Sequence, residues 1–174
     1  MNFFEFFGLP VSFQVDNAAL RNAFLQNSKK FHPDFHTLAG DADQADMLER
    51  STLNNEAYKT LADADRRMRY VLEIKGLLGS EETHPPLPQA FLMEMMDINE
   101  SLMDLEFDYD PERYEAALHS VADMQQTLDR QIEPVLNSWT ETDGTGPLTA
   151  VRDYFLKKRY LLRIRENLSK FAPH

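Results

Sequence analysis

Residues 20–34, LRNAFLQNSKKFHPD, decide the fold of the first part of the chain. Apolar side chains recur there at a helical period, and Lys29 and Lys30 lie on the opposite, polar face. Pro33 disfavours helical geometry at His32, so the helix is expected to end there and to lead into a short turn. The stretch therefore predicts a basic helix followed by a loop that displays an imidazole and a carboxylate.

The tripeptide His32-Pro33-Asp34 allows three interpretations. Proline and aspartate are frequent turn residues, so it can be an ordinary turn that ends a helix. The spacing of His32, Asp34 and His36 also offers suitable metal ligands, and a chain that used them would be a metal-dependent hydrolase. No further cluster in the sequence completes a metal shell, and we predict neither a metal nor a cofactor. A polar loop after a helix can instead carry a binding function.

Composition limits the class of protein. The 174 residues are 43% hydrophobic and 27% charged, which is typical of a soluble globular protein with one good core or two small ones. The chain has no cysteine, which excludes a disulfide scaffold, a cysteine nucleophile and a cysteine-ligated zinc or iron–sulfur site within it. No apolar run approaches membrane-spanning length, and the amino end lacks the pattern of a signal peptide. We therefore expect an intracellular protein that does not enter a membrane.

The net charge of −11 is unevenly distributed. Residues 81–143 contain 2 basic and 16 acidic side chains, whereas residues 147–170 contain 7 and 2. An acidic body repels a phosphate backbone, so nucleic-acid binding is disfavoured. The basic patch on the helix before His32 is small and suits an acidic protein surface.

Hydrophobic periodicity predicts four helices in the first 76 residues and no strand. Asp16 stands where the second helix needs an N-cap, and Asp63 stands at the start of the fourth. In the third helix we expect Leu48 to point inward. In the fourth, the arginines at positions 66, 67 and 69 are expected around an apolar core face. The four helices are expected over residues 3–7, 17–31, 43–61 and 63–75.

Residues 80–88 contain three prolines, which fit neither a helix nor a central strand, and are expected to form a linker. Three longer helices follow, and the inward stripe of the second is expected to include Trp139. Pro134 is expected to kink or break that helix. The sequence therefore predicts an all-α protein with two domains, residues 1–79 and 89–174.

The first domain resembles a DnaJ-type J-domain. A short aromatic helix, a basic helix, His32-Pro33-Asp34, LNNEAYKTL at residues 53–61 and RRMRY at residues 66–70 occur in the right order. The Gly/Phe-rich region and the CxxC zinc module of DnaJ are absent. The second domain resembles that of HscB-type co-chaperones of iron–sulfur cluster assembly. Its FLME sequence at residues 91–94, the acidic and apolar run that follows, and Phe155-Leu156 carry this resemblance.

The resemblance implies a non-enzymatic adaptor in which a four-helix J-domain packs beside a three-helix bundle. It also implies that a DnaK/HscA-type ATPase chaperone is stimulated and that an IscU-type scaffold protein is the client. Phe35 follows Asp34, where the family usually has a lysine. Carried over residue by residue, the chaperone-binding residues are Arg21, Lys29, Lys30, His32, Pro33 and Asp34.

The first helix of the second domain is apolar on more than one face. Its second stripe includes Met103 and has acids beside it, which suits an adaptable, Met-rich surface for a protein partner. A thicker core or a weak homodimer through this stripe is the alternative. The resemblance places client-binding positions on the stripe and Phe155 beside it from the last helix. The expected client-binding residues are Leu92, Met93, Met96, Asp97, Glu100, Asp104 and Phe155.

Besides the hydrolase, two other functions stay open: a generic J-protein with a different client, and a structural or oligomerising helical protein. The expected location is the cytoplasm, or the mitochondrial matrix for a processed eukaryotic protein.

Overall fold

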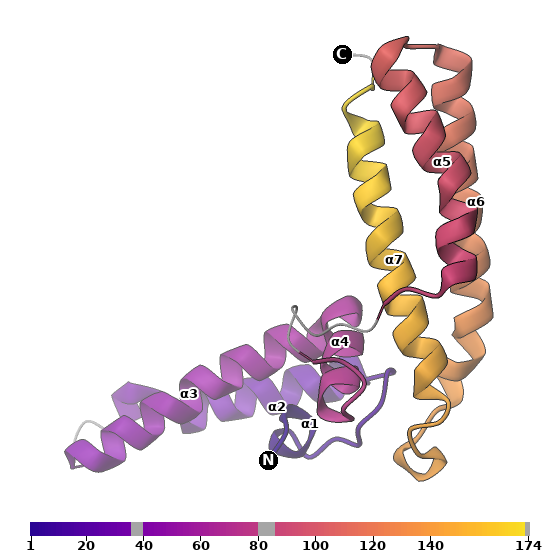
Figure 1. Cartoon of the computed structure of the whole chain (residues 1–174). Coiled ribbons are helices and arrows are strands. Elements are labelled where there is room, and N and C mark those ends of the chain that lie inside the picture. The colour runs from indigo at the N-terminus through magenta and orange to yellow at the C-terminus, as the bar shows by residue number, and fades with distance from the viewer. Residues whose placement is uncertain (36–39, 80–85, 173–174) are drawn as a thin grey trace. The chain divides into compact units, whose positions relative to one another are not determined.

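The computed structural model describes residues 1–35, 40–79 and 86–172, and these ranges form helices and no strand (Figure 1). The predicted all-α class is confirmed. Contacts divide the chain into two compact units. The N-terminal unit comprises Met1–Gly76 and Trp139–Asp143, and the C-terminal unit comprises Leu77–Ser138 and Gly144–His174. Residues 80–85 of the expected linker lie outside the described residues. In the described ranges no helix is long and apolar enough to span a membrane.

In its described residues, the N-terminal unit contains four α-helices and two short 3-10 helices. The long helices α2 and α3 lie side by side (Figure 1). The elements are α1 (Phe3–Phe6), α2 (Asn17–Lys30), η1 (Pro33–Phe35), α3 (Asp41–Ala62), α4 (Ala64–Ile74) and η3 (Glu141–Asp143).

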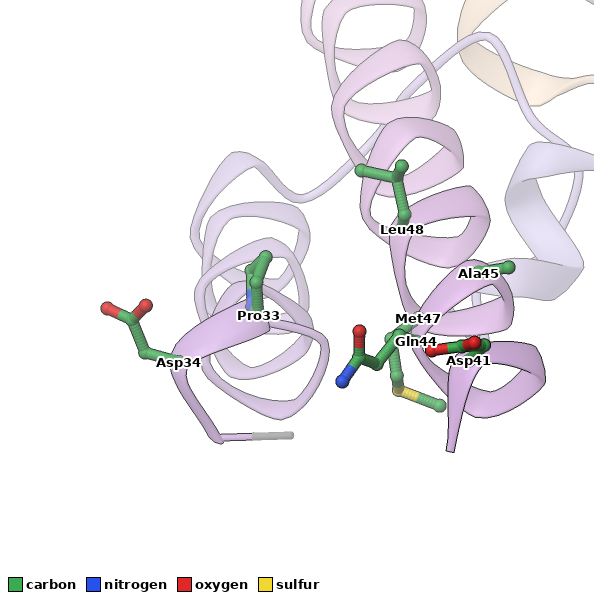
Figure 2. Close-up of a pocket in the computed structure, with 7 residues that line it drawn as sticks. All are labelled: Pro33, Asp34, Asp41, Gln44, Ala45, Met47 and Leu48. Atoms are coloured by element: carbon green, nitrogen blue, oxygen red, sulfur yellow. The ribbon is translucent and has the colours of Figure 1, made fainter. Parts of the chain in front are cut away.

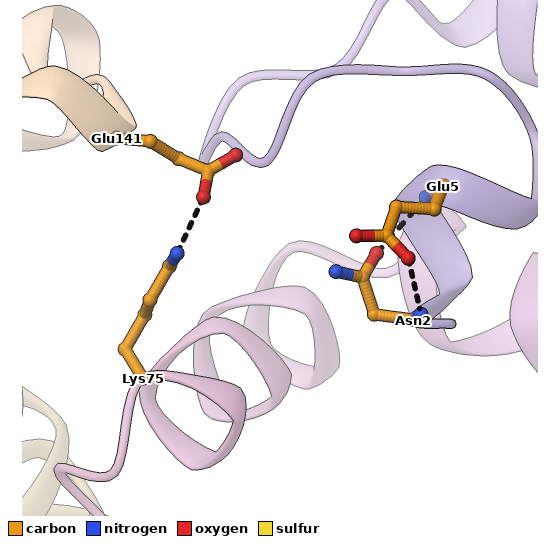
Figure 3. A network of polar contacts seen from close by, with 4 residues as sticks. All are labelled: Asn2, Glu5, Lys75 and Glu141. Carbon is orange, nitrogen blue, oxygen red and sulfur yellow. Dashed lines mark hydrogen bonds and ion pairs between the residues drawn. The ribbon is translucent and has the colours of Figure 1, made fainter.

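Side-chain caps fix the starts of α1, α2 and α4. The Asp16 carboxylate accepts hydrogen bonds from the N–H groups of Ala18 and Ala19 at 3.0 and 3.2 Å, and Asp63 caps α4 in the same way. The predicted cap at Asp16 is confirmed, and the fourth helix starts at the expected place, with Asp63 as its N-cap. At α1, Asn2 and Glu5 form a reciprocal capping box (Figure 3). These local bonds satisfy N–H groups that a helix leaves without partners.

Aromatic contacts and one buried amide hold the helices of the N-terminal unit together. Phe24 of α2 stacks on Tyr58 of α3 at 4.3 Å between ring centroids. Beside this pair the buried Asn54 amide donates to the Phe24 carbonyl and to Ser28 Oγ, both at 3.2 Å. The expectation that Leu48 points inward is wrong, because its side chain is largely exposed on α3. The contacts of Phe24 and Ser28 on α2 with Asn54 and Tyr58 on α3 therefore fix the register of the two helices, and Leu48 does not take part.

Arg67 is buried, although the sequence suggested a position around the outside of α4. Its Nε donates to the Phe13 carbonyl at 2.8 Å, and its Nη1 donates to the Leu61 carbonyl. Desolvation lowers the pKa of the guanidinium, and Asp63 opposes this shift. Two backbone carbonyls far apart in sequence thus obtain their donors from one side chain.

The segment Trp139–Asp143 completes the N-terminal unit from a distant part of the sequence. The Trp139 side chain is 4% exposed and lies 5.3 Å from the Phe13 ring, and Lys75 pairs with Glu141 (Figure 3). The expected position of Trp139 on a helical stripe is wrong, because α6 ends at Ser138.

The C-terminal unit is a bundle of three long helices, which lie side by side in Figure 1. Pro134 lies inside the second helix, which does not break there. Met95, Leu105, Val121, Leu161 and Leu168 form the centre of the core, so each helix contributes an apolar stripe. The helices are α5 (Gln89–Phe107), α6 (Pro111–Ser138) and α7 (Leu148–Ser169).

Candidate partner-binding sites

The first candidate site begins at the end of α2. The buried side chain of Phe31 anchors the helix end, and its N–H still donates to the Asn27 carbonyl at 2.9 Å. Lys29 and Lys30 are exposed, and so is Arg21 two turns earlier. The helix end therefore presents cations to solvent while an aromatic ring holds it in the core.

Residues 32–34 form a turn with an internal hydrogen bond. The Asp34 N–H donates to His32 Nδ1 at 3.2 Å, and His32 Nδ1 lies 3.6 Å from the Asp34 carboxylate. In this bond Nδ1 accepts, so a neutral imidazole carries its proton on Nε2. The side chains of His32 and Asp34 are 52% and 85% exposed, so both are accessible to solvent.

A hollow of about 550 Å³ lies between this turn and the start of α3 (Figure 2). Pro33 lines it on one side, and Gln44, Met47 and Leu48 line it on the other. The Asp34 carboxylate points away from α3 (Figure 2). The turn therefore offers an acidic group outward and, beside it, a hollow lined by both apolar and polar side chains.

The described residues contain no group of three histidine, cysteine or acidic side chains that could hold a metal ion. His36, the third ligand of the metal alternative, lies outside the described residues. His32 and Asp34 are joined by a hydrogen bond within the turn, so the Asp34 N–H already occupies His32 Nδ1.

The second candidate site is the outer face of α5. Met93 and Met96 are 63% and 65% exposed, and Leu92 is 40% exposed. The acidic side chains at positions 97, 100 and 104 are exposed on the same helix. Asp104 lies 3.7 Å from the Arg113 guanidinium. These apolar side chains do not belong to a thicker core, and six predicted client-binding positions share this helix.

Phe155, the seventh predicted client-binding residue, is only 8% exposed, and the Arg159 guanidinium covers its ring at 5.6 Å. Tyr160 of α7 contacts α5 directly. Its hydroxyl accepts a hydrogen bond from Asn99 Nδ2 at 2.9 Å, and its ring lies edge-on to Phe91 at 5.7 Å. Sequence reasoning missed Tyr160, although its place directly before the inward Leu161 is a signal for the edge of the buried stripe.

Comparison with known proteins gives matches to both units. Residues 87–169 match the family described as the HSCB C-terminal oligomerisation domain. A co-chaperone protein HscB homolog of Vibrio cholerae is 30% identical over 98% of this chain and 96% of its own length. A homolog of the same description from Aeromonas hydrophila is also 30% identical, with the same coverage.

Two solved structures share the fold along nearly the whole chain. The chaperone HscB from Vibrio cholerae has a TM-score of 0.63 at 27% identity and covers 99% of this chain and 100% of its own. The human co-chaperone protein HscB has a TM-score of 0.67 at 25% identity and covers 97% of this chain and 81% of its own.

Proposed function

The chain belongs to the HscB family of co-chaperones, and on this premise we propose a division of labour between its two units. The loop at residues 32–34 stimulates the ATPase of a DnaK/HscA-type chaperone. The outer face of α5 carries an IscU-type iron–sulfur scaffold protein to that chaperone. HscB co-chaperones are not enzymes, so ATP hydrolysis takes place on the partner. The bacterial relatives favour a cytoplasmic location.

The proposed chaperone site rests on one observation: an exposed turn, held by an internal hydrogen bond, directly follows the basic end of α2. Lys29 and Lys30 attract an acidic surface and accelerate encounter, because charges at the rim of an interface act mainly on association. His32 and Asp34 then meet the partner in a shape that the internal hydrogen bond already fixes, which lowers the entropy lost on binding. Arg21, exposed two turns before Lys29, adds a further cation on α2.

The client site rests on apolar side chains that the bundle leaves exposed. The bundle gains little stability from side chains as exposed as Met93 and Met96, whereas a protein interface gains most of its affinity from a few such anchors. Leu92, at 40% exposed, lies beside them. Asp97, Glu100 and Asp104 provide a polar rim. Phe155 contributes by packing under Arg159, and Tyr160 fixes α7 against α5.

The test is ATP hydrolysis by an HscA-type chaperone in single turnovers, with the full chain added, with and without a scaffold protein. We expect stimulation by the chain alone and a further increase when the scaffold is present. Treating the chain with a chelator, and removing the chelator before the assay, distinguishes the metal alternative. The chaperone itself needs Mg²⁺ with its ATP, so chelator must be absent from the assay, and a co-chaperone keeps its effect after this treatment. A chain that leaves ATP hydrolysis unchanged in both conditions contradicts the proposal.

A further inference from the structure

Helix α5 exposes apolar side chains beyond the expected client site. Phe107 at its end is 90% exposed, and Met103 is 60% exposed. In the described residues, ten large hydrophobic side chains are exposed, and five of them lie on this one helix. They are Leu92, Met93, Met96, Met103 and Phe107.

The spacing of these residues is that of a helix-packing seam. Met93, Met96, Glu100, Met103 and Phe107 follow one another in steps of three, four, three and four residues. These steps are the a and d positions of a heptad, and they define one narrow line along a helix. We call this line the outer seam. The buried residues of α5 lie on the opposite face of the helix, so the bundle does not use the outer seam.

The charge of α5 defines the chemistry of a partner. The helix contains five acidic and no basic side chains. Glu100 sits in the middle of the outer seam, between Met96 and Met103. A helix packed on the seam would cover this carboxylate, and a covered carboxylate needs a cation opposite it. The occupant must therefore be apolar along one line and basic beside it.

A second copy of this chain fits the outer seam poorly. Pairing α5 with α5 brings carboxylates against carboxylates. Helix α7 is basic, with six lysine or arginine side chains against two acidic ones. However, Leu162 is the only exposed large hydrophobic of α7, all of whose residues are described. A seam with four apolar anchors finds one apolar counterpart on α7, so neither α5 nor α7 of a second copy suits it, and another protein is the occupant that the proposal takes.

We infer that the client surface continues along α5 to Phe107 and accepts a basic amphipathic α-helix of the client, with a lysine or arginine opposite Glu100. From Met93 to Phe107 the outer seam spans about 21 Å at 1.5 Å per residue, which is about four helical turns. Three of its anchors are methionines, whose flexible side chains adapt to a partner helix. This inference rests on the proposed client function of α5.

The experiment uses the full chain and two probes. The first probe is a synthetic peptide of three heptads with leucine at a and d, lysine at e and g, and one lysine at the central a position. A matched peptide carries glutamate in place of every lysine. The second probe is an IscU-type scaffold protein. Fluorescence anisotropy measures peptide binding, and calorimetric titration measures scaffold binding. The variants are Phe107→Ser and Glu100→Lys, and the control is Leu162→Ser on α7.

The lysine peptide is expected to bind the parent chain and the glutamate peptide is not. Phe107→Ser and Glu100→Lys should each lower the affinity for both the lysine peptide and the scaffold by about tenfold or more. Leu162→Ser should change these affinities by less than about twofold. In a further outcome, the scaffold does not bind the parent chain, while binding of the lysine peptide is lost in Phe107→Ser and Glu100→Lys. That result supports the outer seam as a site for a basic helix and shows that the proposed client is wrong.

Two results overturn the inference. In the first, the lysine peptide does not bind the parent chain. In the second, Phe107→Ser and Glu100→Lys bind the scaffold as the parent does, while alanine at positions 92, 93 and 96 abolishes scaffold binding. In the second case the proposed function stands. Sedimentation equilibrium tests the second-copy alternative. A dimer that Phe107→Ser dissociates, without any effect on the two probes, also overturns the inference.

Discussion

The two proposed binding surfaces differ in what holds them in shape. The turn at His32 is polar, and its position depends on the anchor at Phe31 and on the packing of the whole N-terminal unit. The stripe on α5 is apolar, and a regular helix alone sets the directions of its side chains. A change far away in the core should therefore impair the first surface. The second surface can be altered residue by residue without loss of the fold.

The largest expected contrast lies between the two faces of α5. Alanine at Leu92, Met93 and Met96 together should leave the melting temperature nearly unchanged, because exposed helix positions tolerate alanine. Scaffold binding by calorimetry should disappear. Alanine at the buried Met95, Ile98 and Leu105 should cost about 2–5 kcal/mol per site and unfold the bundle. Circular dichroism melts compare the variants. Equal destabilisation by both triple changes would show that the outer stripe is structural.

Trp139→Ala should produce the next largest effect, because it removes a buried ring that packs on Phe13. The expected loss is about 3–5 kcal/mol in the N-terminal unit. Amide hydrogen exchange in α2 and α4 should accelerate, and chaperone stimulation should fall while scaffold binding persists. Leu162→Ala is the matched control at an exposed site. Unchanged protection in α2 and α4 would mean that residues 139–143 do not support this unit.

Arg67→Ala should have a smaller effect on the same unit. It leaves the carbonyls of Phe13 and Leu61 without their donor, which costs about 1–3 kcal/mol. Urea denaturation measures the loss. Arg66→Ala, an exposed neighbour, should change stability by less than about 0.5 kcal/mol. If the two variants proved equally stable, the buried guanidinium would contribute nothing to the position of α4.

Lys29→Ala with Lys30→Ala should have the smallest effect and should leave folding intact. Exposed charges act on encounter and are screened beyond about 8–10 Å at physiological salt. Association with the chaperone should slow by about two- to tenfold at low salt and depend less on salt concentration. Stopped-flow binding across a salt series measures this slope. If the salt dependence of the association rate were identical to that of the parent, the end of α2 would not be part of the docking face.

Local signals in the sequence predicted much of this structure. Asp16 and Asp63 act within two or three residues of their own positions, so their caps follow from the sequence. The inward stripe of α5 was predictable because the helical spacing of its apolar residues lies within one short stretch of sequence. The break expected at Pro134 did not occur, because α6 continues through this residue to Ser138.

Contacts between distant segments were not predictable. Arg67 looks like a surface residue until the carbonyls of Phe13 and Leu61 are placed beside it. Trp139 appeared to continue a helical stripe, and its contact with Phe13 depends on the fold of residues more than a hundred positions earlier. In the candidate client site, Tyr160 was missed because its partner Asn99 lies on another helix.

The most direct test of the account is a comparison of His32→Gln with the Leu92, Met93 and Met96 triple alanine variant in two assays. One assay measures single-turnover ATP hydrolysis by the HscA-type chaperone, and the other measures scaffold affinity by calorimetry. His32→Gln should abolish stimulation while scaffold affinity and melting temperature remain those of the parent. The triple variant should stimulate normally without the scaffold and should not bind it. A His32→Gln variant that stimulates as well as the parent contradicts the account.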